Sequence, residues 1–168
     1  MRSLLDGPPG TTLFSVLERE LRIAPRRAVS LAFLDVDDHT GFNARHGWGA
    51  GNLALQHVGD VLCALGADAI VGHYGGDEFA VVLPGTGRRA AISRLRRALK
   101  RISRKGNSTC ARVHASIGGT TSCASSTPST LIVTAHRALV TAKESGGHRV
   151  AWTHGCSVSD ASISRRSA

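Results

Sequence analysis

The chain has 168 residues, of which 42% are apolar and 4% aromatic, and its formal net charge is +9. This length suits one domain with a real hydrophobic core and leaves no room for a separate sensory domain. There is no run of about 18 apolar residues, so we expect no membrane span. The apolar start of the chain is too short for a signal-peptide core before Asp6, which favours a cytoplasmic protein.

Cysteine and arginine usage bear on two further classes. The four cysteines form no C-x-x-C pair, so we expect neither a metal nor a disulfide role for them. The pI of about 10.7 suits nucleic-acid binding, but 18 of the 21 basic residues are arginine. A GC-rich coding bias produces the same excess, and we do not expect a nucleic-acid partner.

Apolar periodicity and turn residues predict the elements in chain order. They are a turn over 6–10, a helix over 11–23, a strand over 28–37, a short helix over 40–46, a longer helix over 52–65, a hairpin over 69–83, a helix over 86–105, a strand over 112–120, a helix over 131–145 and an edge strand over 150–152. This order favours an α/β (α+β) domain with a central five-stranded, mostly antiparallel sheet flanked by helices on both faces.

The predicted elements also divide the chain into segments. Residues 1–27 hold the N-terminal turn and helix, 28–152 form the core of the domain, and 153–168 form a small, polar tail that we expect to be disordered.

Two acidic clusters stand at the ends of predicted strands. Asp35, Asp37 and Asp38 end a nearly continuous apolar run, and Asp77 and Glu78 follow the glycine turn of the hairpin. These five residues are a large share of the chain's 12 acidic residues, in a protein that is basic as a whole. Carboxylates at two strand ends in such a chain favour hard divalent cations and a phosphate-bearing substrate.

The stretch Gly75-Gly76-Asp77-Glu78-Phe79 resembles the signature of GGDEF domains. Further matches follow the family order and spacing at 34–37, Asn43, Gly47, Gly51, 115–118 and 142–146. The resemblance covers roughly residues 6–152. It implies the palm-like fold of nucleotidyl cyclases and the synthesis of cyclic di-GMP from two GTP molecules, with release of pyrophosphate.

The same resemblance assigns roles to individual residues. Mg²⁺ or Mn²⁺ would be bound by Asp35, the Val36 carbonyl, Asp77 and Glu78, and the last two would also be the catalytic residues. Substrate binding would fall to His39, Thr40, Asn43, Asn52, Gly75, Gly76 and Lys143. Because each domain of this family binds one nucleotide, catalysis implies a homodimer.

Several positions depart from the family pattern. Thr40 and Gly147 stand where the family has a Lys and an Arg near the phosphates, and Trp48 stands where it has a His. Asn52 replaces an Asp. Its amide offers the base one acceptor and one donor instead of two acceptors, so the sequence does not decide between guanine and adenine as the preferred base. Residues 66–69, at the inhibitory R-x-x-D site, hold neither the Arg nor the aligned Asp, so we expect no product inhibition there.

Three functions therefore remain open. The favoured one is an active cyclase that uses GTP. The others are a degenerate domain that binds nucleotide and signals without turnover, and a cyclase with another base preference or product. We expect any regulatory protein to be external, and we interpret the arginine-rich face of the helix over 86–105 as a solvated face, since no aromatic residues interleave for base stacking.

Overall fold

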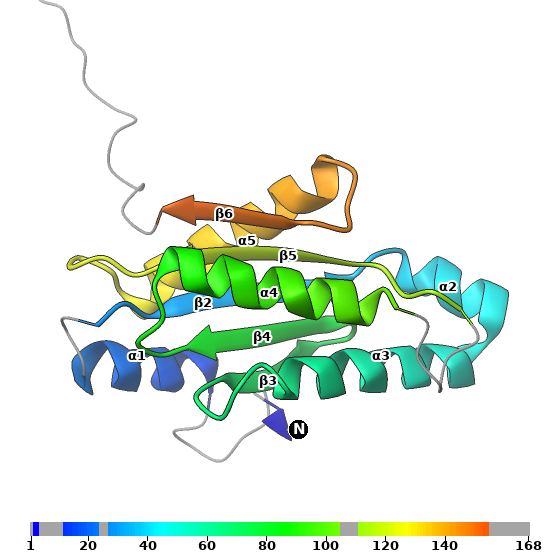
Figure 1. Cartoon of the computed structure of the whole chain (residues 1–168), viewed down its shortest axis with the longest axis horizontal. Helices are drawn as coiled ribbons and strands as arrows, with labels where there is room; N and C mark the ends of the chain where they lie inside the picture. The colour runs from blue at the N-terminus through cyan, green and yellow to red at the C-terminus, as the bar shows by residue number, and fades with distance from the viewer. Residues whose placement is uncertain (1, 4–11, 24–26, 105–110, 155–168) are drawn as a thin grey trace, which may run out of the picture.

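The computed structural model describes residues 2–3, 12–23, 27–104 and 111–154. Its elements, shown in Figure 1, are β1 (Arg2–Ser3), α1 (Leu13–Ile23), β2 (Ser30–Val36), α2 (His39–His46), α3 (Trp48–Cys63), β3 (Ile70–Gly75), β4 (Glu78–Leu83), α4 (Arg88–Ile102), β5 (Ala115–Thr121), α5 (Pro128–Glu144) and β6 (Val150–His154). The predicted turn over 6–10 and residues 155–168 of the predicted tail lie outside the described residues.

One sheet joins the strands in the order β1-β3-β4-β2-β5-β6. The central strand β2 pairs antiparallel with β4 and β5, and β3 pairs antiparallel with β4, whereas β1 and β6 join the edges in parallel. The predicted α+β class and the five-stranded, mostly antiparallel core of the sheet are confirmed. The two-residue β1 is an addition to the prediction, because so short a segment carries no periodicity.

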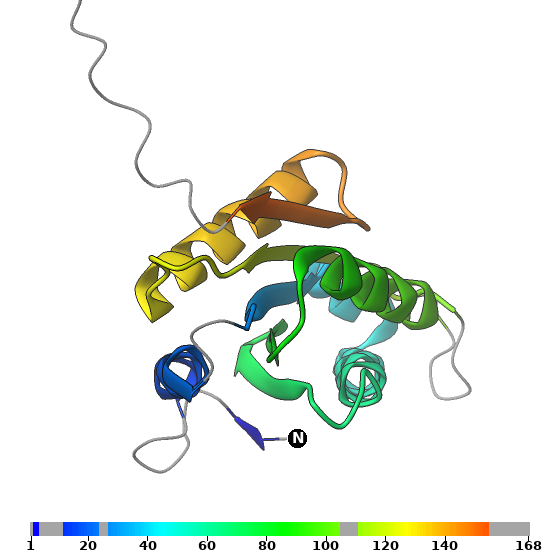
Figure 2. The ribbon, with the colours of Figure 1, turned by 60° about the vertical axis from the view of Figure 1, so that its left-hand side comes forward.

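Helices cover both faces of the sheet, α1 and α5 on one side and α3 and α4 on the other (Figure 2). Along β2, Leu34 and Val36 pack with α3 and α4, while Leu31 and Phe33 pack with α1 and α5. Successive strand residues point to opposite faces, and burial on both faces explains the continuous apolar run. Asp35 alternates in step with Leu31 and Phe33, so its side chain lies on the face of the sheet that α1 and α5 cover, at the end of β2.

Every predicted helix is present. The starts that differ most from the prediction are those of α3 and α5, which begin at Trp48 and Pro128 and not at 52 and 131. The predicted loop before α5 is partly helical, because Thr127 and Thr130 form a capping box: each side chain accepts the backbone N–H of the other, at 3.2 and 2.9 Å. Pro128 follows as the first helical residue, where its missing N–H costs nothing. None of the helices described is long and apolar enough to cross a membrane.

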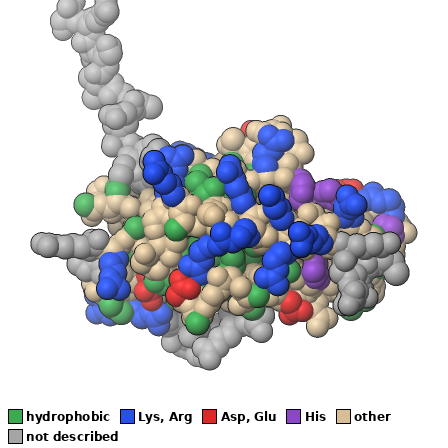
Figure 3. Space-filling view, in the orientation of Figure 1, with side chains coloured by type: hydrophobic (Ala, Val, Ile, Leu, Met, Phe, Trp, Pro, Cys, Tyr) green, Lys and Arg blue, Asp and Glu red, His purple; other side chains and the backbone are tan. Residues whose placement is uncertain are grey.

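The basic face predicted for α4 is exposed. Lys and Arg side chains spread over this helix in Figure 3, and the exposed ones on α4 are Arg88, Arg89, Arg96, Arg97, Lys100 and Arg101. Solvent therefore reaches these charges, as the interpretation of a solvated face requires.

Two expectations need correction. Cys123 is disulfide-bonded, so the absence of a C-x-x-C pair was a poor guide to its role, whereas Cys63 is a free, exposed thiol. The strand β6 continues to His154, two residues beyond the predicted end of the core at 152.

Candidate active site

Two neighbouring strands bring three of the predicted metal-binding carboxylates to one end of the sheet. Asp35 on β2 is the direct cross-strand partner of Glu78 on β4, so their side chains leave the same face. The Val36 N–H donates to the carbonyl oxygen of Asp77 at 3.3 Å, which ties the end of β2 to the hairpin turn. Like charges placed directly opposite one another destabilise a sheet. The pairing of Asp35 with Glu78 therefore lowers the stability of the fold, which suggests a functional reason for it.

The hairpin turn separates Asp77 from Glu78 although they are adjacent in the chain. Gly76 has a φ of +45°, which an L side chain rarely adopts. The register of β3 against β4 shifts between His73 and Gly75, which marks a bulge, and His73 Nε2 donates to the Gly76 carbonyl oxygen at 2.7 Å. As a result Asp77 faces α2 and Glu78 faces α5.

Two side chains of α5 face the carboxylates on the sheet. Lys143 Nζ lies 2.7 Å from Asp35 Oδ1, and His136 Nδ1 lies 3.3 Å from Glu78 Oε1. Seven residues, about two helical turns, separate His136 from Lys143, so both lie on one stripe of α5. The His136 ring stacks on Phe33 with ring centroids 3.8 Å apart, which fixes its orientation. His136 is absent from the predicted site residues, although its spacing of seven residues from Lys143 would have placed the two side chains on one face of a helix.

The charges at this end of the sheet are in conflict. Burial, followed by repulsion from Asp35 and Asp77, raises the pKa of Glu78 to about 7. Burial also raises the pKa of Asp35, and the hydrogen bond with Lys143 opposes part of that rise. One ammonium therefore balances three clustered carboxyl groups, and added positive charge would stabilise the ionised state.

The donor atoms suit a hard divalent cation, because Mg²⁺ and Mn²⁺ prefer carboxylate and carbonyl oxygens. Among the described residues, however, no three His, Cys, Asp or Glu side chains are arranged so that they could hold a metal ion together. Asp35 is bound to Lys143, and Asp77 Oδ2 lies 3.9 Å from His39 Nδ1. The residues fit a divalent cation by donor type and by charge, and the ion pair with Lys143 uses only the Oδ1 atom of Asp35.

The other two acidic residues of the first cluster have structural roles. Asp37 accepts hydrogen bonds from the Ser116 hydroxyl at 2.7 Å and the His148 N–H at 2.9 Å, which fastens the loop after α5 to β5. Asp38 caps α2 by accepting the Gly41 N–H at 3.2 Å. Of the five clustered carboxylates, these two are accounted for by the fold and the other three are not.

A cleft of about 540 Å³ opens beside Asp77, between α2, the start of α3 and the hairpin turn. It is lined by His39, Thr40, Asn43, Ala44, Trp48, Asn52, Leu55, Gly76 and Asp77. Two of its residues carry buried polar atoms without a hydrogen-bond partner, His39 Nε2 and Asn43 Oδ1. Such atoms typically cost about 1–3 kcal/mol each when left unpaired, and a polar ligand that reached them would recover part of that cost.

The cleft also explains a glycine of α3. A Cβ at Gly51 would collide with Asn43 Oδ1 and lie 3.1 Å from His39 Nε2. Glycine at this position therefore leaves room for the two unpartnered atoms.

A second hollow, of about 560 Å³, lies on the other side of the β2–α2 connection. Basic residues on its wall are Arg45, Arg112 and Lys143, and Gly147 also lines it. Arg45 binds Asp38 at 3.0 Å. Lys143 is shared between this hollow and the carboxylate cluster, which makes it the link between them.

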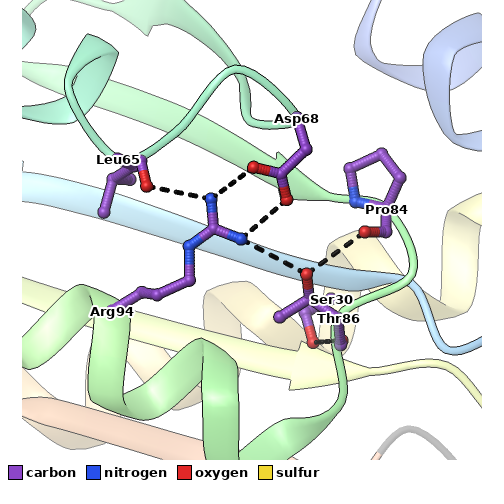
Figure 4. Close-up of polar contacts among 6 residues, drawn as sticks. All are labelled: Ser30, Leu65, Asp68, Pro84, Thr86 and Arg94. Carbon is purple, nitrogen blue, oxygen red and sulfur yellow. Dashed lines mark hydrogen bonds and ion pairs between the residues drawn. The ribbon is translucent and has the colours of Figure 1, made fainter.

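The predicted inhibitory position 66–69 is filled from within the chain (Figure 4). Arg94 of α4 donates to both carboxylate oxygens of Asp68, at 2.7 and 2.8 Å, and to the Leu65 carbonyl oxygen at 3.0 Å. Gly66 has a φ of +146°, and a Cβ there would lie 2.7 Å from Arg94 Nη2. An Arg cannot occupy position 66 without displacing this contact.

Comparison with known proteins identifies the family. The family model described as "Diguanylate cyclase, GGDEF domain" matches residues 11–149. The chain therefore belongs to the GGDEF domain family, as the signature at 75–79 indicates.

Individual relatives cover the chain to different extents. Diguanylate cyclase DgcP of Escherichia coli (strain K12) is 41% identical over 73 residues, which are 43% of this chain and 20% of DgcP. The match thus spans about a fifth of the length of that relative. The GGDEF domain of DgcB from Caulobacter crescentus, solved in complex with c-di-GMP, shares the fold, with a TM-score of 0.75 at 24% identity over 82% of this chain and 85% of that one.

Another solved relative was captured with a partner. Diguanylate cyclase SiaD of Pseudomonas aeruginosa, in complex with its activator SiaC, gives a TM-score of 0.73 at 26% identity, over 84% of this chain and 56% of SiaD.

Proposed function

We propose that this chain is a diguanylate cyclase, which condenses two GTP molecules into cyclic di-GMP and pyrophosphate. The observation that carries the proposal is the placement of Asp35, Asp77 and Glu78 at one end of the sheet, next to a cleft with unpartnered polar atoms on His39 and Asn43. Carboxylates that repel one another, beside a cleft whose residues carry polar atoms without hydrogen-bond partners, suit a nucleotide that binds together with a cation. Membership of the GGDEF family supports the same reaction.

In this reaction the 3′-hydroxyl of one nucleotide attacks the α-phosphorus of the other. The new O–P bond forms as the bond to pyrophosphate breaks, and we assign Asp77 as the acceptor of the hydroxyl proton. A second attack, by the 3′-hydroxyl of the other nucleotide, closes the ring and releases the second pyrophosphate. Mg²⁺ or Mn²⁺, bound by Asp35, the Val36 carbonyl, Asp77 and Glu78, would neutralise the charge on the reacting phosphate oxygens. Gly76 leaves the backbone of the turn open to the phosphates, because it carries no Cβ.

We assign Lys143 to the phosphate oxygens of the substrate. Its ammonium neutralises Asp35 in this structure and lies at the border of the second hollow, where Arg45 and Arg112 add positive charge. Asn43 and Asn52 take the base in the cleft, and the GTP preference rests on how their amides meet its edge.

The product requires two protomers. The described residues contain one carboxylate cluster and one cleft beside it, which accommodate one nucleotide, whereas the cyclic product contains two. We infer a homodimer in which the two sites face each other. An external regulatory protein fits this arrangement, and SiaD with its activator SiaC is a relative of that kind.

One observation favours a second function, nucleotide binding without turnover. Lys143 occupies Asp35, and within the described residues no metal-binding group of three side chains is assembled. If the ion pair of Lys143 with Asp35 keeps the cation out when nucleotide is bound, the domain signals by contact only.

The decisive experiment incubates the purified chain with Mg²⁺ or Mn²⁺ and with GTP, ATP or both, and separates the products by mass spectrometry. Cyclic di-GMP from GTP alone is the expected result. Asp60→Asn, which removes an exposed carboxylate of α3, is the matched control and should leave the product unchanged. Bound but unconverted GTP would support the second function, and an adenine-containing product would contradict the GTP preference.

A further inference from the structure

The most exposed large apolar side chain among the described residues stands at the cleft. Trp48 is 76% exposed, against 66% for Ile23 and 53% for Val140. It is the first residue of α3 and lines the cleft together with Asn43 and Asn52. Within the part of the chain that the structure describes, the indole has no hydrogen bond and no contact with another ring. It is therefore free to meet a ligand.

The backbone around Trp48 is held to the residues that carry the unpartnered atoms. Gly47, with a φ of +83°, ends α2 and begins α3. Its N–H donates to the Asn43 carbonyl oxygen at 2.8 Å, and its own carbonyl oxygen accepts the Gly51 N–H at 3.2 Å. These bonds fix the position of Trp48 relative to the buried Asn43 amide.

Exposure alone does not indicate a site, since single apolar side chains are common on protein surfaces. Ile23 lies on α1 and Val140 on α5, and neither lines the cleft. Trp48 differs because it borders a cavity whose lining residues His39 and Asn43 each carry a buried polar atom without a partner. Leu55 and Ala44 supply further apolar surface in the same cavity.

We propose that Trp48 is a base-stacking residue, whose indole covers one face of the purine while Asn43 and Asn52 meet its edge. The inference deepens the proposed function, because it takes the ligand to be a purine nucleotide. Stacking is tolerant of base identity, since every base has a π-face, whereas edge contacts are selective. Trp48 therefore supplies affinity for purines in general, and Asn52 sets the choice between GTP and ATP.

The chain permits a direct optical test, since it contains two tryptophans. Trp152 is half-buried on β6 and donates from Nε1 to Thr121 Oγ1 at 3.3 Å. In the Trp152→Phe variant, Trp48 becomes the single tryptophan reporter. Titration with Mg²⁺ and the α,β-methylene analogue of GTP, which cannot release pyrophosphate, should quench its fluorescence saturably. Inorganic tripolyphosphate, which lacks a base, should not.

Calorimetry on variants adds a quantitative arm. Trp48→Ala should weaken binding of the α,β-methylene analogues of GTP and ATP by about ten- to a hundredfold each, the range typical of base–aromatic stacking, with their ratio unchanged. Trp48→Phe should retain most of the affinity. Val140→Ala, an exposed apolar residue outside the cleft, is the control and should bind as the wild type does. Trp48 is exposed, so thermal unfolding should be unaffected in each variant.

Several outcomes would overturn the inference. One is unchanged affinity in Trp48→Ala; another is an altered oligomeric state of that variant with normal nucleotide binding, which would make Trp48 a protein contact. Quenching without any cyclic product would support stacking on Trp48 and contradict the cyclase assignment. Cyclic product without quenching would support the cyclase assignment and contradict stacking on Trp48.

Discussion

The two ends of the sheet hold acidic residues in opposite environments, one in the loop before β3 and the others at the end of β2 and the start of β4. At one end, Asp68 is bound by Arg94 through two hydrogen bonds, which lower the pKa of Asp68 and raise that of Arg94. At the other end, burial raises the pKa of both Asp35 and Glu78. The same sheet thus holds one carboxylate whose partner lowers its pKa, and a cluster of three carboxylates in which burial and repulsion outweigh the single ammonium of Lys143.

The Arg94 end shows what charged groups do when they serve the fold. Arg94 also donates to the Leu65 carbonyl oxygen and reaches Thr86 Oγ1 at 3.4 Å, while the Ser30 hydroxyl donates to the Thr86 carbonyl oxygen at 2.7 Å (Figure 4). Loops before β3 and after β4 are joined in this way. The carboxylates at the other end of the sheet are not joined by a comparable set of hydrogen bonds. We therefore expect function there, because a bound cation would relieve the repulsion between these carboxylates.

The largest expected effect is at the carboxylate end. Asp35→Asn and Asp77→Asn should each lower the rate of cyclic di-GMP formation at least about a hundredfold, because each replaces a charged oxygen ligand without changing side-chain size. Melting temperatures should hardly move, or should rise, as repulsion is relieved. Initial rates and thermal melts of the two variants measure both effects, and full activity in either would show that it binds no essential cation.

At the opposite end, the expected effect is on stability. Arg94→Leu removes the partner of Asp68 and of the Leu65 carbonyl oxygen and should lower the free energy of unfolding by about 1–2 kcal/mol; the contribution is limited because Asp68 is well exposed. Arg97→Leu, a more exposed arginine of the same helix, should change it by less than about 0.5 kcal/mol. Urea unfolding of the two variants measures the difference. Equal losses of unfolding free energy would show that the contacts of Arg94 do not stabilise the fold.

The pH dependence of stability sharpens the contrast. The folded pKa of Glu78 is about 7 against an ordinary value of 4.5, so the folded state holds this proton more tightly. Its ionisation therefore destabilises the fold increasingly as pH rises from 4.5 to 7, and not below that window. In EDTA, Glu78→Gln should stabilise the protein by about 1–2 kcal/mol at pH 8, allowing for partial solvent screening. No gain should appear at pH 4, and an equal gain at both values would exclude titration as the cause.

Base selection is expected to respond more weakly. Asn52→Asp should restore a second acceptor for guanine and raise the GTP/ATP affinity ratio about tenfold. Competition titrations on the wild type and the variant give the ratio. An unchanged ratio would show that this side chain does not read the base.

The smallest expected effect is none at all. Cyclic di-GMP at micromolar concentration should not lower the initial rate, because Gly66 faces Arg94 and the inhibitory Arg is absent. Rates measured with and without added product test this. Tight, non-competitive inhibition would place a product-binding site elsewhere, with the exposed arginines of α4 as the first region to mutate.

Periodicity was enough to predict the fold, since each long element has a regular apolar stripe or a two-sided apolar run. What it missed were local contacts: the Thr127–Thr130 capping box that begins α5 early, and the two-residue β1. Motif spacing likewise singled out Asp35, Glu78 and Lys143, but not the pairs that these side chains form. The pairing of Asp35 with Lys143, and of Glu78 with His136, depends on how α5 is seated on the sheet, which is a tertiary property.

The central claim is that the carboxylate end is built to receive a cation and a nucleotide together. Thermal unfolding of the wild type and of Asp35→Asn, with Mg²⁺, with the α,β-methylene analogue of GTP, and with both, tests it most directly. We predict a rise of several degrees for the wild type when both are present at saturating concentration, and little for Asp35→Asn. An equal rise in the two proteins would show that the nucleotide binds without the carboxylates, and would contradict the claim.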